Sequence, residues 1–191
     1  ISMADAVLFG CGLGTTERTA QLLSLTLRRA SQPVVIDADG LNALGGNIHL
    51  LKEARAPLIL TPHPGEMARL CGLSVREVQA NRAQIAIRFA SHHKVCLVLK
   101  GHGTLIAAPD GGLILNETGG PGLARGGSGD LLAGMIASLL AQGMTPRAAA
   151  ACGAFLHGMA ADRTAERLSQ TAMLPRDVLD DLAGIFAEYG R

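Results

Sequence analysis

Short runs of apolar residues recur along the chain and predict buried strands. Four of these runs cover residues 6–9, 34–36, 58–60 and 95–99. Segments with helical periodicity lie between them, and the first helix is predicted to run from Thr15, its N-cap, to about residue 29. Continuous apolar strands that alternate with helices are typical of a parallel sheet with helices on both faces.

The rest of the chain predicts a further helix, a hairpin and three more helices. Helical periodicity covers residues 74–89, and Ser74 with Glu77 forms a capping box at its start. Residues 104–108 and 113–116 flank a four-residue turn, which is typical of a β-hairpin. The last three helices are predicted to begin near Asp130, at Thr145-Pro146 and near Pro175.

These elements together predict one α/β domain over residues 1–191, with a mostly parallel central sheet. The chain opens almost directly on its first strand, so we expect it to be the C-terminal portion of a longer protein.

Composition excludes several classes of function. The formal net charge is +1 and only five of the 191 residues are aromatic, so we expect neither nucleic acid nor a membrane surface as a partner. The longest apolar run, residues 131–141, is too short to span a bilayer. The four cysteines include no Cys-x-x-Cys pair, so we interpret them as reduced core thiols of a cytoplasmic protein and do not expect a zinc site.

Polar and glycine-rich motifs directly follow the predicted strands. Parallel strands end at one edge of a sheet, where ligands bind, so these motifs predict one shared site. The four motifs are Gly10-Cys-Gly-Leu-Gly14, Asp37-Ala-Asp39, Thr61-Pro-His-Pro-Gly-Glu66 and Lys100-Gly-His-Gly-Thr104.

Each of the four motifs has a structural and a functional interpretation. The first is a tight turn, a substrate contact or, least convincingly, part of a dinucleotide-binding fingerprint. Asp37 and Asp39 can hold Mg²⁺ through water, or Asp39 can cap a helix. Two prolines hold His63 rigidly, which suits a ligand contact, although a solvated loop gives the same pattern. The motif from Lys100 to Thr104 offers a cation and a hydroxyl to a nucleotide, or forms a simple turn.

The glycine-rich run at residues 116–130 is the strongest motif. Six glycines lie between Gly119 and Gly129, and they end at Asp130 and a predicted helix start. Backbone N–H groups of glycines and of a helix N-terminus bind anions, phosphate above all. We interpret the run as an anion hole for a transferring phosphoryl group, with Asp130 as the base toward the attacking hydroxyl.

Taken in order, these motifs resemble those of the ADP/ATP-dependent NAD(P)H-hydrate dehydratases, a family of the ribokinase-like superfamily. The resemblance implies a three-layer α/β/α fold, of which the N-terminal part of the domain is missing from this sequence. In bacteria such domains are often fused to an NAD(P)H-hydrate epimerase, and the family tends to form homo-oligomers.

The resemblance also implies roles for particular residues. The adenine nucleotide would be held by Lys100, Gly101, His102, Gly103, Thr104 and Gly129. The hydrated nicotinamide would contact Gly12, His63 and Asp130. The backbone of Gly127, Ser128 and Gly129 would face the terminal phosphate as the anion hole. A metal held through water would lie near Asp37, Asp39 and Glu66.

The implied reaction is metabolite repair by a hydro-lyase. ADP, or ATP, phosphorylates the ring hydroxyl of the S-epimer of hydrated NADH or NADPH with the help of Mg²⁺, and K⁺ is a further expected ion. Loss of phosphate then restores NADH or NADPH. Phosphate leaves readily, whereas hydroxide does not.

The chain departs from the family pattern at two positions. Gly120 replaces an asparagine and Arg125 replaces a threonine. Two alternatives to a dehydratase stay open. One is a ribokinase-like kinase of a small thiazole or pyrimidine alcohol, and the other is a nucleotide-binding domain with impaired catalysis.

Overall fold

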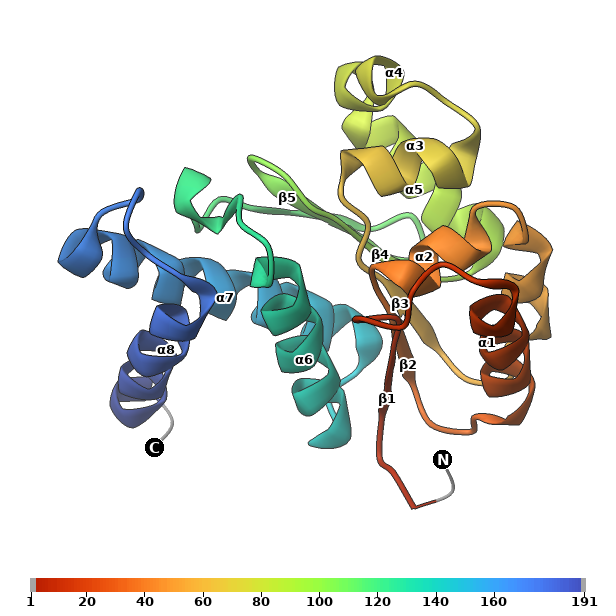
Figure 1. The fold of residues 1–191 in the computed structure, drawn as a ribbon, viewed down its shortest axis with the longest axis horizontal. Helices are drawn as coiled ribbons and strands as arrows, with labels where there is room; N and C mark the ends of the chain where they lie inside the picture. The colour runs from red at the N-terminus through yellow and green to blue at the C-terminus, as the bar shows by residue number, and fades with distance from the viewer. Residues whose placement is uncertain (1–2, 190–191) are drawn as a thin grey trace.

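A single six-stranded sheet organises the chain in the computed structural model, which describes residues 3–189 (Figure 1). Neighbouring strands in the sheet are also neighbours in the sequence. The first four strands pair in parallel, and the last two pair antiparallel, so the predicted mostly parallel sheet and hairpin are confirmed. The strands are β1 (Val7–Phe9), β2 (Val34–Ile36), β3 (Leu58–Leu60), β4 (Cys96–Leu99), β5 (Thr104–Ala107) and β6 (Leu113–Asn116).

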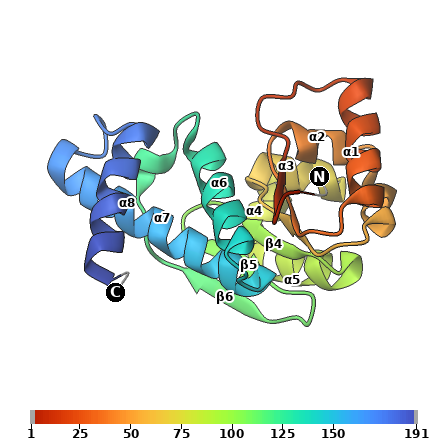
Figure 2. The same cartoon turned by 90° about the horizontal axis from the view of Figure 1, so that it is seen from below.

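Helices cover both faces of this sheet, as predicted (Figures 1 and 2). One face carries α1 (Glu17–Arg29), α2 (Asp39–Leu44), α3 (Pro64–Cys71), α4 (Val75–Ala80) and α5 (Arg82–His93), with the short 3₁₀ helix η1 (Ile48–Glu53). The other face carries α6 (Ser128–Ala141) and α7 (Pro146–Leu168). A second 3₁₀ helix, η2 (Pro121–Leu123), precedes α6, and α8 (Pro175–Tyr189) packs on α7.

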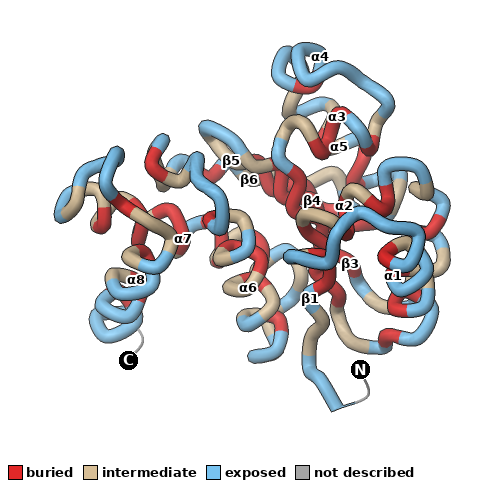
Figure 3. Tube along the Cα trace, viewed as in Figure 1, coloured by how far each residue is buried: buried red, intermediate tan, exposed pale blue. Residues whose placement is uncertain are grey.

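Strand alternation explains why the sheet has a core on each side. In β2, Val34 and Ile36 join the core under α1 to α5, whereas Val35 joins the core under α6 and α7. All three side chains are fully buried, and the most buried part of the trace runs through the strands (Figure 3). A sheet buried on both faces needs continuous apolar strands, which is the pattern that the sequence has.

Several helix boundaries differ from the predicted ones. Thr16, not Thr15, caps α1, because its hydroxyl accepts from the Thr19 amide while the Thr15 hydroxyl donates to Asp39. The helix predicted over residues 74–89 is in fact two helices, which break at Asn81. The Asn81 side-chain amide donates to the backbone carbonyl of Glu77. Side-chain hydrogen bonds of this kind compete with those of the helix backbone, so asparagine favours a break.

Other predicted helix signals are confirmed. Ser74 and Glu77 form a capping box, and Thr145 caps α7. The short helices α2 and α3 were not predicted as helices of their own, because they lie inside the polar motifs that follow β2 and β3. Among residues 3–189 the helices lack the combination of length and apolar character that a membrane crossing requires.

Candidate active site

Four of the five predicted motifs, all except Gly10-Cys-Gly-Leu-Gly14, contribute residues to one cleft of about 880 Å³ at the carboxyl edge of the parallel strands. Residues after β2, β3 and β4 form one wall, and the glycine-rich run with the start of α6 forms another. A third wall comes from the end of β6 and from α7. The predicted site residues that line the cleft are Asp37, His63, Glu66, Lys100, Gly101, His102, Thr104, Gly127, Ser128, Gly129 and Asp130. The predicted site residues Gly12, Asp39 and Gly103 lie outside this lining.

A buried ion pair joins the ends of β2 and β4 at the floor of the cleft. The Lys100 Nζ donates to Asp37 Oδ1 at 2.9 Å, and Thr61 Oγ1 donates to the same oxygen at 2.7 Å. The exposed fraction is 2% for the Asp37 side chain and 19% for that of Lys100, so both charges are largely out of water. Lys100 Nζ also lies 3.9 Å from Glu66 Oε2. The ammonium predicted to meet nucleotide phosphates is thus already engaged with two carboxylates.

His63 is held by the helix that it caps. Its Nδ1 accepts from the amides of Gly65, at 3.0 Å, and Glu66, at 3.4 Å, while Glu66 Oε2 accepts from the His63 amide at 2.7 Å. This reciprocal capping box, with Pro64 in the first turn, fixes the side chain at the start of α3. Because Nδ1 accepts, the neutral ring carries its proton on Nε2. Half of the side chain is exposed, so the predicted rigid and accessible histidine is confirmed.

The first turn of α6 offers unpaired amides to the cleft. Gly127 is the N-cap, with a left-handed φ of 92°, and it has no side chain to cap the helix. The Ser128 amide donates to the Arg125 carbonyl at 3.2 Å. In the described part of the chain, the amides of Gly127 and Gly129 donate to no protein acceptor. A helix N-terminus with free N–H groups attracts an anion, so this turn can bind a phosphate.

Asp130 follows these amides and lies beside a thiol that we had not predicted at the site. A Cys11 sulfur and one carboxylate oxygen each of Asp37 and Asp130 lie within 4.8 Å of one another. Burial, and then the hydrogen bond and negative charge of Asp130, raise the pKa of Cys11 to about 12. Cys11 therefore stays a neutral thiol that donates to Asp130. The prediction of reduced core thiols is confirmed for buried Cys96, while Cys11 and Cys71 are partly buried and pack against the core, and all four cysteines are free.

The three acidic residues predicted to hold a metal through water each make a different contact in the structure. Asp37 pairs with Lys100, and Glu66 caps α3. Asp39 accepts from the Gly14 amide at 2.7 Å and from Thr15, so it fixes the loop that contains Gly12. The two carboxylates that face each other are those of Asp37 and Asp130. A water-mediated metal at Asp37, Asp39 and Glu66 stays a prediction.

The two departures from the family pattern are both tied to the connection between α7 and α8. The guanidinium of Arg125 donates to the Thr171 carbonyl. A Cβ at Gly120 would lie 2.4 Å from the side-chain nitrogen of Gln170. The side-chain oxygen of Gln170 accepts a hydrogen bond from the Gly122 amide. The glycine-rich run is therefore held from outside by residues that follow α7.

Sequence reasoning missed the wall that α7 contributes. Asn116 donates from Nδ2 to the Ala154 carbonyl at 3.4 Å, and Thr118 donates to the Phe155 carbonyl at 3.0 Å. A Cβ at Gly158 would lie 2.2 Å from the Thr118 hydroxyl, so only glycine allows this approach. His157, which belongs to none of the sequence motifs, is buried and lines the cleft. The run of small residues in α7 was the available signal.

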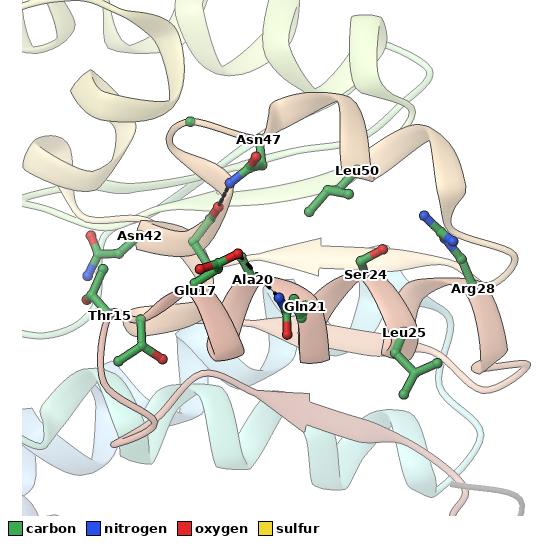
Figure 4. Close-up of a pocket in the computed structure, with 13 residues that line it drawn as sticks. Thr15, Glu17, Ala20, Gln21, Ser24, Leu25, Arg28, Asn42, Asn47 and Leu50 are labelled. Carbon is green, nitrogen blue, oxygen red and sulfur yellow. Dashed lines mark hydrogen bonds between the residues drawn. The ribbon is translucent and has the colours of Figure 1, made fainter.

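A second hollow, of about 780 Å³, lies between α1 and the segment from α2 to η1 (Figure 4). Figure 4 shows side chains of Glu17, Gln21 and Asn47 there, and the two hydrogen bonds drawn join residues of the same wall. None of the predicted site residues lines this hollow. The cleft at the sheet edge is therefore the candidate active site.

The ion pair of Lys100 with Asp37 is expected to be strongly coupled. Lys100→Met should lower the free energy of unfolding at pH 7 by about 3–5 kcal/mol, because it leaves the buried Asp37 carboxylate without a cation. The double variant Lys100→Met, Asp37→Asn should lose less than the sum of the two single variants. Urea unfolding of all four proteins measures both quantities.

The matched control is Arg147→Met, which breaks an exposed pair with Asp110 at 3.5 Å. It should cost less than about 1 kcal/mol. Equal losses for Lys100→Met and Arg147→Met, with additive effects in the double variant, would contradict a buried and coupled pair.

Known proteins are similar to this chain in sequence and in fold. The family model for NAD(P)H-hydrate dehydratase matches residues 1–183. A bifunctional NAD(P)H-hydrate repair enzyme, Nnr, from Moorella thermoacetica is 46% identical over 182 residues, which are 95% of this chain and 34% of that protein. This chain thus spans about a third of the length of that relative.

Solved structures agree with the family match. An ADP/ATP-dependent NAD(P)H-hydrate dehydratase from Bacillus subtilis, co-crystallised with ATP and Mg²⁺, is 36% identical and superposes with a TM-score of 0.86, over 96% of this chain and 64% of that one. A ribokinase-like superfamily protein from Enterococcus faecalis is 30% identical, with a TM-score of 0.81 over 97% of this chain and 64% of that one. The ribokinase-like fold predicted from the motifs is confirmed, and the chain belongs to the NAD(P)H-hydrate dehydratase family.

Proposed function

We propose that this chain carries the nucleotide-dependent dehydration of the S-epimer of hydrated NADH or NADPH. In the first step the ring hydroxyl attacks the terminal phosphorus of ADP or ATP, so that a new O–P bond forms and the shortened nucleotide leaves. In the second step the C–O bond breaks, phosphate leaves with the electron pair, and the ring loses a proton to restore the dihydronicotinamide. The observation that carries the proposal is the meeting of Asp130 with the uncapped start of α6 in one cleft.

The anion hole supports the phosphoryl-transfer step. The free amides of Gly127 and Gly129 are fixed before any ligand arrives, because the backbone of α6 holds them. Donors that are already oriented stabilise charge that develops on a phosphoryl group without reorganising. Lys100 lies beside them, since a Cβ at Gly129 would be 3.2 Å from its Nζ. This cation can therefore contribute to the potential at the phosphate although it stays paired with Asp37.

The donor set of the site also fits Mg²⁺. Asp37 and Asp130 present carboxylate oxygens near each other, and carboxylates and water are the ligands that Mg²⁺ prefers. When bound there, the ion would offset the negative charge of the nucleotide phosphates. K⁺ stays an expectation from the resemblance.

Asp130 is the proposed base. It is exposed to the cleft, within the first turn of α6, and its described side-chain contact is the Cys11 thiol. A neutral thiol donor orients the carboxylate without neutralising it, so Asp130 can still take the proton of the attacking hydroxyl. His63 also lines the cleft, and its Nδ1 is occupied by the amides of α3. Its Nε2 lies 3.4 Å from Glu66 Oε1, and the Nε2–H can turn from this carboxylate to an oxygen of the hydrated nicotinamide.

The wider setting is part of the proposal. The bifunctional relative supports a fusion to, or joint work with, an NAD(P)H-hydrate epimerase. A homo-oligomer in the cytoplasm is expected from the resemblance.

The direct test supplies hydrated NADH with ADP or ATP to the full-length protein and follows the recovery of NADH absorbance. Phosphorylation of a thiazole or pyrimidine alcohol without recovery of NADH would favour a small-molecule kinase instead.

Asp130→Asn should lower the rate by at least about 10²-fold, the usual contribution of a general base, and change nucleotide affinity by only a few fold. Single-turnover assays and calorimetry with ADP measure the two effects. Asp110→Asn, at the exposed turn between β5 and β6, is the control and should keep the full rate. Loss of ADP binding with an unchanged rate per bound enzyme would contradict the role of Asp130 as the base.

His63→Asn separates substrate contact from helix capping. Asparagine also caps helices well, so α3 should keep its start, whereas the Nε2–H is lost. We expect the KM for the hydrate to rise by about 3- to 10-fold, as for one lost hydrogen bond, and ADP affinity to stay within twofold. His49→Asn, at an exposed position of η1, should change neither value. Equal weakening of hydrate and ADP would show that His63 only shapes the cleft.

A further inference from the structure

His157 of α7 lines the same cleft as the first turns of α6. Gly153, one turn earlier in α7, packs so closely on Ile136 of α6 that an added Cβ would lie 2.7 Å from the Ile136 side chain. The two helices are joined by a short turn and lie side by side (Figures 1 and 2). One turn further along α7, His157 lines the cleft together with Leu132 of α6. The histidine is only 5% exposed.

The His157 ring lacks a hydrogen-bond partner that its burial calls for. Its Nε2 is shielded from solvent and has no partner among residues 3–189. The other such buried atom in that range is Nε of Arg82, whose guanidinium donates through its terminal nitrogens to the carbonyls of Leu99 and His102. A buried and unpaired polar group is destabilising, and native proteins keep few of them. An orphan that lines a cleft points to a ligand as the missing partner.

The charge state of the ring narrows the class of ligand. Burial, and to a smaller extent the positive charge of Lys100, lower the pKa of His157 to about 4. At neutral pH the ring is therefore uncharged, with one nitrogen that donates and one that accepts. Such a ring suits a neutral heteroatom better than a phosphate. Three apolar residues that line the same cleft, Leu123, Leu132 and Ala154, suit a flat and largely apolar ring.

The contacts of α7 and β6 indicate which half of the cleft His157 adjoins. Thr104, in the segment proposed to hold the nucleotide, pairs directly with Asn116 across β5 and β6. Asn116 in turn bonds to the carbonyl of Ala154, one turn before His157. His63 belongs to a different wall, at the start of α3. The His157 wall therefore adjoins the nucleotide half of the cleft.

We propose that His157 recognises the base of the bound adenine nucleotide, with the imidazole hydrogen-bonded to a nitrogen of the purine. This inference rests on the proposed function, since it needs a nucleotide in the cleft. The terminal torsion of a histidine side chain is soft, so the ring can turn to meet the base. The contact would set the preference for adenine, while the amides of α6 hold the phosphates.

The test measures the binding of ADP, GDP and pyrophosphate to the full chain by calorimetry. His157→Leu should weaken the binding of ADP by about 3- to 10-fold, which corresponds to the loss of one neutral hydrogen bond. The affinity for pyrophosphate should stay within twofold. The substitution should also reduce the preference for ADP over GDP. His157→Gln, which keeps an amide at the position of the outer ring nitrogens, should restore part of the ADP affinity. His93→Leu, on α5 and outside the cleft lining, is the control histidine and should bind ADP normally.

Thermal unfolding separates ligand recognition from a structural role. Without ligand, His157→Leu should melt at the same or a higher temperature, because leucine removes an unpaired buried nitrogen. A structural histidine would give a lower melting temperature. If His157→Leu and His157→Gln both bind ADP as tightly as the unmodified chain, or if ADP and pyrophosphate weaken equally, the inference is wrong. If the unmodified chain binds no ADP, the proposed function itself is wrong.

Discussion

The buried pair of Lys100 and Asp37 is the interaction on which the site depends. It joins the ends of β2 and β4, and Thr61 at the end of β3 donates to the same carboxylate. Its ammonium lies directly beside Gly129, so the pair also sets how closely α6 approaches the sheet. Buried ion pairs rarely stabilise a fold more than apolar residues of similar size do. Its place at the floor of the cleft is better explained by the potential that it creates for a phosphate.

The glycine-rich run follows from the same requirement. Free amides at a helix start can only reach a ligand if no side chain caps them, and Gly127 supplies the left-handed turn without one. Such a segment has little packing of its own to hold it. The connection after α7 holds it instead by two hydrogen bonds. The Arg125 guanidinium donates to the Thr171 carbonyl, and the Gly122 amide donates to the Gln170 side chain. The two departures from the family pattern, Gly120 and Arg125, both contact this connection, which gives them a structural role in this chain.

The sequence predicted the parts of the molecule that depend on local patterns. Apolar runs gave the strands, and side chains such as Ser74 and Thr145 marked helix starts, because caps act within one turn. It did not predict that Lys100 pairs with Asp37, 63 positions away, or that Cys11 contacts Asp130. Those contacts depend on the order of strands in the sheet and on where α6 lies. His157 was missed for the same reason, since a histidine among small residues looks like any core position.

The cleft carries several polar groups that the free protein leaves without partners. They are the amides of Gly127 and Gly129 at the start of α6 and Nε2 of His157. Each one costs stability or stays hydrated, and each can be satisfied by a ligand: the amides by an anion and the uncharged imidazole by a neutral heteroatom. A fold optimised for stability alone would cap the helix and replace the histidine with an apolar residue. Their presence at one edge of the sheet, on elements held by buried contacts, is therefore the strongest structural argument that this edge was selected for binding.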